Sequence, residues 1–157
     1  ETDDELGGSE YLSVQHGIAA GEIPALDLEL EIAVQDAVRA GIREGIVKSA
    51  HDCSEGGIGI ALAESCIAGN IGANVALDDG LEATSSLFSE TQSRIVVTVA
   101  NGDVERLLDI LSADNVPYSV LGEVGGDRLI IENKIDLSVA EMAEPFNSSL
   151  EKLVAGE

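Results

Sequence analysis

The segment from Val47 to Ser65, VKSAHDCSEGGIGIALAES, constrains the fold more than any other part of the sequence. An apolar strand is expected to end near His51-Asp52-Cys53, two glycines follow, and a run of small residues then has the composition of a helix. We call residues 51–57 the glycine turn. Such a strand–turn–helix unit is either a tight structural corner or a cradle for a ligand, and the local pattern leaves both interpretations open.

The rest of the chain continues this alternation of strands and helices. Ser9 and Asp27 are expected N-caps, and Gly45 is expected to end a long helix. A Gly-Gly-Asp turn at 125–127 predicts a hairpin between the last two strands. The predicted helices are 10–15, 28–44, 58–68, one turn near 86, 103–113 and 138–154; the predicted strands are 47–53, 74–77, 94–100, 118–124 and 128–132. This order predicts an α+β layered domain, with a mixed sheet covered by helices.

Composition limits the partners more than it limits the fold. The 157 residues are 45% hydrophobic but only 3% aromatic, so Leu, Ile, Val and Ala must fill the core of one ordinary domain. Thirty acidic residues stand against eight basic ones, for a net charge of −22. This charge repels nucleic-acid phosphates and anionic lipids, which excludes both as partners and favours a strongly solvated surface. The sequence contains no apolar run long enough to span a bilayer, and we expect a cytoplasmic protein.

Several residues of the glycine turn have the chemistry of an anion site. Gly56 and Gly57 allow a positive φ and close approach of a ligand, and the N–H groups that open a helix carry partial positive charge. Ser54 adds a hydroxyl donor. Asp52 and Glu55 repel a bare phosphate unless Mg²⁺ or another cation intervenes. Physical reasoning alone therefore leaves a ligand cradle and a structural turn about equally favoured.

Four other features are weaker candidates. His51 and Asp52 are strand neighbours whose side chains are expected on opposite faces, which disfavours an acid–base couple. Cys53 and Cys66 match no zinc or Cys-x-x-Cys spacing, and Cys53 is disfavoured as a nucleophile. The third is a second glycine turn, Gly7-Gly8-Ser9, which opens a short helix and is another possible anion site. The fourth is an alternation of Glu90, Gln92 and Arg94 before the strongest strand; the three are expected to share one face, in a salt bridge or exposed to solvent.

Four motifs in order resemble a known family. They are DELGGSEYL, PALDLELE, VKSAHDCSEGGIGIALAES and LFSETQSRIVVTV. The resemblance that they carry covers residues 4 to about 124. Together they resemble the C-terminal, AIR synthase-related domain of phosphoribosylformylglycinamidine synthase, in the synthetase subunit of the small multi-subunit type. The resemblance implies a fold similar to the C-terminal domain of aminoimidazole ribonucleotide synthetase. It also implies a lead-in segment at 1–25, one domain at 26–157, and a fragment of a longer chain, consistent with the absence of an initial Met.

The resemblance further implies a reaction for the whole enzyme. ATP phosphorylates the amide oxygen of formylglycinamide ribonucleotide, and ammonia derived from glutamine displaces the phosphate to give formylglycinamidine ribonucleotide. ATP and Mg²⁺ would act in the full enzyme, with no metal assigned to this chain, and the fragment alone would be inactive. The implied partners are upstream nucleotide-binding domains, a glutaminase subunit and a small bridging subunit.

Within this chain, the resemblance implies a substrate- and phosphate-binding surface facing a nucleotide-binding domain, and it assigns no catalytic step to any residue. The residues expected to line that surface are Gly7, Gly8, Ser9, His51, Asp52, Ser54, Glu55, Gly56 and Gly57. Two alternatives stay open. The domain is a structural and assembly module that does not touch substrate, or it belongs to a related small-molecule kinase of the same superfamily.

Overall fold

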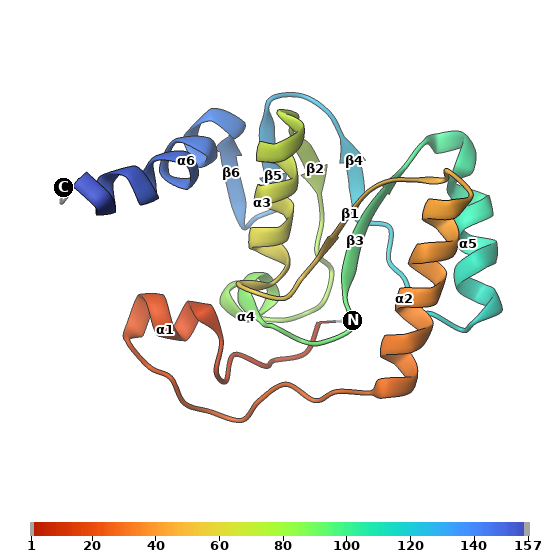
Figure 1. Ribbon diagram of the computed structural model, residues 1–157, viewed down its shortest axis with the longest axis horizontal. Helices are drawn as coiled ribbons and strands as arrows, with labels where there is room; N and C mark the ends of the chain where they lie inside the picture. Colours follow the sequence, from red (N-terminus) through yellow and green to blue (C-terminus); the bar gives the residue numbers. More distant parts are fainter. Residues whose placement is uncertain (1, 156–157) are drawn as a thin grey trace. The chain divides into compact units, whose positions relative to one another are not determined.

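The computed structural model describes residues 2–155 and divides into two compact units. Within these residues, the first unit comprises residues 2–61 and 79–120, and the second comprises residues 62–78 and 121–155. Figure 1 labels the helices and strands along the chain. In chain order they are α1 (Glu10–His16), α2 (Leu28–Arg43), β1 (Val47–Asp52), α3 (Gly57–Gly69), β2 (Ala73–Val75), α4 (Ala83–Phe88), β3 (Ile95–Val99), the 3₁₀ turn η1 (Asn101–Asp103), α5 (Val104–Ala113), β4 (Gly122–Val124), β5 (Arg128–Ile131), β6 (Ile135–Ser138) and α6 (Val139–Ala155).

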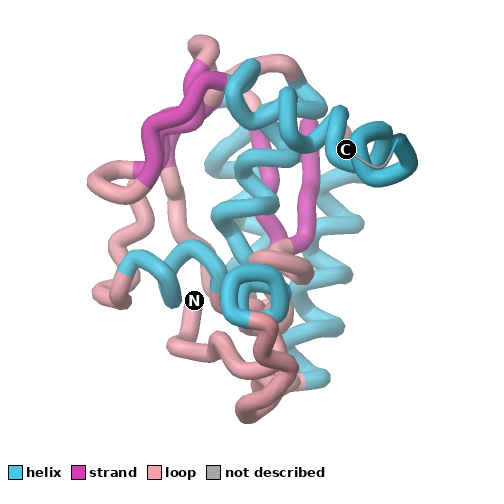
Figure 2. Tube along the Cα trace, turned by 90° about the vertical axis from the view of Figure 1, so that its left-hand side faces the viewer, coloured by secondary structure: helices cyan, strands magenta, loops and turns pink. Residues whose placement is uncertain are grey.

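The core of the first unit lies between a two-stranded sheet and two helices. Strands β1 and β3 pair in antiparallel fashion and run side by side in both views (Figure 1 and Figure 2). Helices α2 and α5 pack together beside them, and one apolar cluster fills the space. Its buried members are Val34, Ala37, Ile46, Val47, Leu107, Leu111 and Val116. The aliphatic core expected from the low aromatic content is therefore found here.

Helix α2 begins and ends at the residues that its sequence predicts. The Asp27 carboxylate accepts hydrogen bonds from the N–H groups of Glu29 and Leu30, at 2.9 and 3.1 Å. These bonds satisfy two of the amide donors that have no partner inside the helix. At the other end, Gly45 adopts a φ of +71°, the left-handed conformation that terminates many helices. The loop between α1 and α2 has no regular structure (pink in Figure 2).

The second unit is built on a four-stranded mixed sheet in the order β4-β2-β5-β6. Strand β2 pairs in parallel with β5, and the other two pairings are antiparallel. One face carries the buried side chains Leu129 and Ile131, both 0% exposed, with Ala73 and Val75 beside them. The predicted mixed sheet is confirmed, as is the α+β class.

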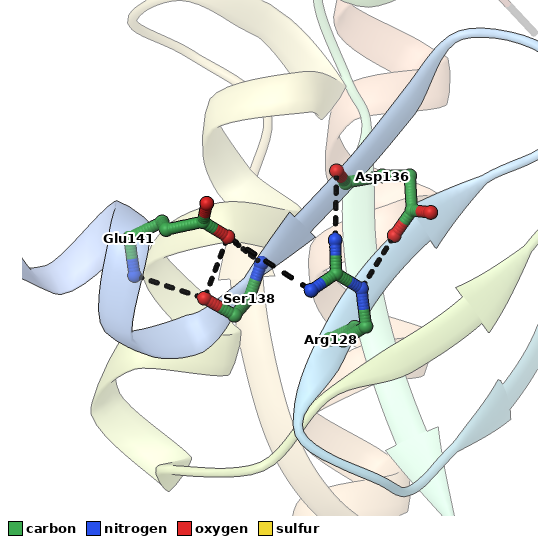
Figure 3. Close-up of polar contacts among 4 residues, drawn as sticks. All are labelled: Arg128, Asp136, Ser138 and Glu141. Carbon is green, nitrogen blue, oxygen red and sulfur yellow. Dashed lines mark hydrogen bonds and ion pairs between the residues drawn. The ribbon is translucent and has the colours of Figure 1, made fainter.

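Helix α6 begins with a reciprocal cap (Figure 3). The Glu141 carboxylate accepts from the N–H of Ser138 at 2.8 Å, and the Ser138 hydroxyl accepts from the N–H of Glu141 at 3.2 Å. This is the Ser-x-x-Glu capping box. The hydrogen bond from the Ser138 hydroxyl is the main cause of the lowered pKa of Glu141. Arg128 pairs with Asp136 on the facing strand at 2.6 Å, so the cluster tightens the β5–β6 hairpin and the start of α6.

Two predictions about the strands are wrong. Strands β4 and β5 do not form a hairpin, because β2 lies between them and pairs with both. The hairpin in this region is instead β5–β6, and β6 has no counterpart among the predicted strands. The strand expected at 118–124 is shortened to Gly122–Val124. Both errors concern short strands, whose local pattern does not distinguish them from loops.

No helix among residues 2–155 is long and apolar enough to cross a membrane.

Candidate functional site

The N-terminal segment lies along the loop that follows helix α4, within the first unit. The N–H of Asp3 donates to the Thr91 hydroxyl at 3.0 Å, and the N–H of Glu5 donates to the Ser89 hydroxyl at 3.2 Å. The Ser85 hydroxyl donates to the Asp4 carboxylate at 2.5 Å. The bond between Glu5 and Ser89 joins the first and fourth of the sequence motifs, and the other two bonds lie beside it.

An aromatic contact joins helix α1 to the end of helix α4. Tyr11 stacks on Phe88, with ring centroids 4.9 Å apart and planes 14° from parallel. His16, at the last turn of the same helix, meets the Tyr11 ring edge-on. A stacked pair at this distance adds to the apolar burial that holds a short helix in place. Helix α1 is therefore anchored to the end of α4.

The Glu90 carboxylate connects the two glycine motifs. Its Oε1 atom accepts from the N–H of Gly56 at 2.8 Å and from the N–H of Glu10 at 2.9 Å. Gly56 immediately precedes helix α3, and Glu10 is the first residue of α1. Each bond is charge-assisted and uses an N–H at the start of a helix. The two segments predicted as separate anion sites thus both donate a hydrogen bond to the Glu90 carboxylate of the same chain.

Gly57 lies too close to the backbone at residues 87–89 to be replaced by any larger residue. A Cβ at Gly57 would lie 2.6 Å from the carbonyl oxygen of Ser89 and 2.7 Å from that of Leu87. Its φ of +70° is also unfavourable for any residue with a side chain. Packing within the chain therefore explains why this position needs glycine, without any bound ligand.

Gly7 has a similar role in the second glycine turn. A Cβ on Gly7 would lie 2.0 Å from the carbonyl oxygen of Glu22. The N–H of Gly8 donates to the carbonyl of Ala20 at 3.1 Å. Ser9 is buried and caps α1: its hydroxyl accepts from the N–H of Leu12 at 3.3 Å and donates to the carbonyl of Leu6 at 2.7 Å. The predicted cap at Ser9 is confirmed.

The exposed part of the glycine turn consists of side chains at the last residue of strand β1 and just after it. Asp52, Ser54 and Glu55 are exposed, whereas Gly56 and Gly57 are buried. The Ser54 hydroxyl donates to the Asp52 carboxylate, and this bond is the main cause of the lowered pKa of Asp52. His51 Nδ1 lies 2.7 Å from the main-chain oxygen of Asp52 and 3.9 Å from its Oδ1. The near contact of the imidazole ring is thus with the main chain of Asp52, and the expectation that the two side chains form no acid–base couple stays a prediction.

Cys53 lies behind this surface and has no sign of reactivity. It is 3% exposed, and burial raises the pKa of its thiol. The thiolate is the nucleophilic form, so a raised pKa disfavours nucleophilic catalysis at this position. The structure thus supports the interpretation of Cys53 as a packing residue.

Arg94 organises the loop rather than a strand face. Its guanidinium donates to the Thr91 carbonyl at 3.0 Å, the Ser89 carbonyl at 2.5 Å and the Thr2 hydroxyl at 2.8 Å. Burial lowers the pKa of Arg94. The prediction that residues 90, 92 and 94 share one strand face is wrong, because strand β3 begins only at Ile95.

Sequence reasoning missed the role of Glu90. A pattern of alternating polar residues before a strand resembles strand-edge solvation, and it gives no sign of an acceptor for two distant amides. The one available signal was the density of acidic and hydroxyl residues in SETQS, which is typical of loops that bind main-chain N–H groups.

No group of three or more His, Cys, Asp or Glu side chains within the described part of the chain is placed to hold a metal ion.

Comparison with known proteins places these motifs in a family. Residues 1–132 match the family described as AIR synthase related protein, C-terminal domain. This chain belongs to that family. The match includes residues 1–25, and the division of the chain at residue 25 stays a prediction.

Curated proteins similar to this AIR synthase-related chain include PurL subunits. It is 46% identical over 99% of its length to the phosphoribosylformylglycinamidine synthase subunit PurL of Moorella thermoacetica, of which it covers 22%. It is 46% identical over 92% of its length to the PurL subunit of Thermomicrobium roseum, of which it covers 20%. The chain therefore spans about a fifth of the length of these relatives.

Solved structures agree with the sequence relatives. The structure described as T. maritima PurL complexed with FGAR is 25% identical to this chain, with a TM-score of 0.76. The matched region covers 90% of this chain and 26% of the PurL chain. The matched chain in the structure of PurLQS from Thermotoga maritima is 26% identical to this chain, with a TM-score of 0.67. The matched region covers 87% of this chain and 25% of that chain. The predicted family and fold are confirmed.

Proposed function

We propose that this chain is the AIR synthase-related segment of an ATP-dependent phosphoribosylformylglycinamidine synthase. The observation that supports this proposal most strongly is the 46% identity to a PurL subunit over 99% of the chain. Related structures described as PurL complexed with FGAR and with ATP support the same assignment. The four motifs lie in the order expected for that family.

In the proposed reaction, phosphorylation turns a poor leaving group into a good one. The amide oxygen of formylglycinamide ribonucleotide attacks the γ-phosphorus of ATP, and the P–O bond to ADP breaks. Ammonia then adds to the activated carbon, and inorganic phosphate leaves with the former amide oxygen. Magnesium, as part of the whole synthase, would screen the phosphate charges during transfer. We assign no metal ligand and no catalytic step to the residues of this chain.

The role proposed for this chain is to form one wall of the substrate site. Gly8, Asp52, Ser54 and Glu55 are exposed beside the junction that Glu90 forms, which supports a surface built from both glycine motifs. His51 is half-buried at the end of β1. The full proposed set is Gly7, Gly8, Ser9, His51, Asp52, Ser54, Glu55, Gly56 and Gly57, of which Gly7, Ser9, Gly56 and Gly57 act through the backbone conformation that they set.

The proposed partners follow from the same family. They are nucleotide-binding domains of the same synthase, a glutaminase subunit and a small bridging subunit, in the cytoplasm. The related Thermotoga maritima structure described as PurLQS supports an assembly of several subunits. The net charge of −22 argues against nucleic acid and anionic membranes as partners.

One observation favours the alternative of a purely structural module. The N–H of Gly56, the N–H of Gly8 and the Ser9 hydroxyl all have partners inside the chain. Donors that are already satisfied contribute little to a ligand. The test must therefore separate substrate binding from mere support of the assembly.

A segment exchange tests the proposed function. The corresponding segment of the Moorella thermoacetica PurL subunit is replaced by this chain, and ammonia-dependent formation of formylglycinamidine ribonucleotide is measured with ATP. Activity is expected for the exchange and not for a subunit from which the segment is deleted. A folded, assembled but inactive exchange would contradict the proposal.

A titration of the chain alone then separates the two roles. Formylglycinamide ribonucleotide and Mg-ATP are added separately while the amide resonances are followed by NMR. Shifts at Gly8, Ser54 and Glu55 with the ribonucleotide support a binding wall. An active exchange combined with no shifts, either in the chain or in the exchanged subunit, favours the structural module.

A further inference from the structure

The Glu90 side chain accepts hydrogen bonds from Gly56 in the glycine turn and from Glu10, the residue that follows the Gly7-Gly8-Ser9 turn. Its two donors, the N–H groups of Gly56 and Glu10, come from segments that the sequence separates widely. Because both bonds end on the same oxygen atom, the two amides are held at a fixed separation. Moving the carboxylate would release both segments together.

The surroundings hold the Glu90 side chain in place. The residue is half-buried, and its own N–H donates to the carbonyl of Glu5 at 3.4 Å. The side-chain amide of Gln92 donates to the Glu90 carbonyl at 3.1 Å. On either side, the Ser89 and Thr91 hydroxyls accept from the N-terminal segment. Glu90 therefore lies at the centre of a loop that is itself fixed at several points.

We propose that Glu90 is a positioning residue that sets the spacing between the Gly7-Gly8-Ser9 turn and the glycine turn. This inference rests on the proposed function, in which both turns face one substrate. Glu90 touches no reacting atom. Its carboxylate fixes the backbone at Gly56 and Glu10, and so aligns the exposed groups at Gly8 and Ser54 for a single ligand.

The shared oxygen gives a signature that a general structural role would not produce. In NMR spectra of this chain, the amides of Gly56 and Glu10 should therefore respond together to a change at the Glu90 side chain. Glu90→Gln should shift both amides, because it replaces a charged acceptor with a neutral one of the same reach. Glu82→Gln is the matched control: it also removes one acidic charge, from an exposed side chain that makes no capping bond, and should shift neither amide.

Substrate kinetics test the consequence. In the PurL exchange described above, Glu90→Ala should raise the KM for formylglycinamide ribonucleotide by about tenfold, since small displacements at a binding site cost affinity steeply. Glu90→Gln should recover much of the loss. Glu90→Asp should not, because the shorter side chain cannot reach both amides. Glu82→Ala should leave the KM unchanged.

The two proposals fail in different ways. An inactive exchange carrying the original Glu90 contradicts the proposed function, and the amide shifts in Glu90→Gln then decide the Glu90 bond by themselves. An active exchange in which Glu90→Ala folds with an unchanged KM overturns the positioning role. A shift at only one of the Gly56 and Glu10 amides in Glu90→Gln overturns the shared acceptor. If Glu90→Ala does not fold, the comparison of Glu90→Gln with Glu90→Asp decides.

Discussion

Gly57 allows the effect of close approach to be separated from the effect of backbone strain. Gly57 and Gly45 have nearly the same φ, +70° and +71°, but a Cβ at Gly45 meets nothing within 4 Å. Gly45→Ala should therefore cost only the left-handed conformation, about 1 kcal/mol of unfolding free energy. Gly57→Ala adds a clash with two backbone carbonyls and should cost about 2–4 kcal/mol. Urea unfolding of both variants measures the difference, and equal losses would contradict the close packing under the Ser89 loop.

The Asp52–Ser54 pair predicts a pH effect of known sign. The Ser54 hydroxyl lowers the pKa of Asp52, so this bond stabilises the fold above the ordinary Asp pKa and is lost as the pH falls through the folded value. Ser54→Ala should raise the pKa of Asp52, as followed by NMR at its carboxyl carbon. Ser112→Ala, outside the glycine turn, is the control. An unchanged Asp52 titration in Ser54→Ala would show that the hydroxyl does not hold the carboxylate.

For single residues, the sequence predicts roles that depend on near neighbours and misses roles that depend on residues far away in the chain. Ser9 and Asp27 are recognisable caps because their partners lie two or three residues away. The role of the Glu90 carboxylate was missed because amides distant in the sequence decide its contacts. Glycines were recognised as special, but the pattern did not say that Ser89 and Leu87, rather than a ligand, come close to Gly57.

Among the elements, α2 offers the cleanest test of a cap. Asp27→Ala removes both acceptor contacts to the first turn and should lower the free energy of unfolding by about 1 kcal/mol. Asp27→Asn is the matched control, since its side-chain oxygen still accepts from the same amides and most of the stability should remain. Chemical unfolding followed by circular dichroism measures both. An equal loss in the two variants would indicate that the charge matters more than the cap.

The elements with strong local signals were predictable, whereas the short strand β6 and the strand partners were not. The β-branched run at Ile95–Val99 and the apolar stripe of α2 are strong local signals, and both elements were found. Their neighbours depend on contacts that are distant in sequence. Strand β2 pairs with both β4 and β5, which no local turn signal encodes, and the Gly-Gly-Asp turn therefore suggested a hairpin that does not form.

For the whole molecule, the charge predicts a clear response to salt. A net charge of −22 on 157 residues destabilises the compact state through self-repulsion. Raising NaCl from about 0.01 M to about 1 M shortens the Debye length from about 30 Å to about 3 Å and should screen most of it. We therefore expect the free energy of unfolding at neutral pH to rise steadily across this range.

Protonation supplies the control for this salt effect. The sequence pI is about 4.1, so the net charge and its repulsion diminish as the pH approaches that value. The gain in stability with NaCl should accordingly shrink in a parallel series at mildly acidic pH, if self-repulsion is its cause. A gain of the same size at both pH values would instead point to a general salting effect on apolar burial. A fall in stability with NaCl at neutral pH would mean that attractive surface pairs, such as Arg106 with Asp103 at 2.8 Å, outweigh the excess of negative charge.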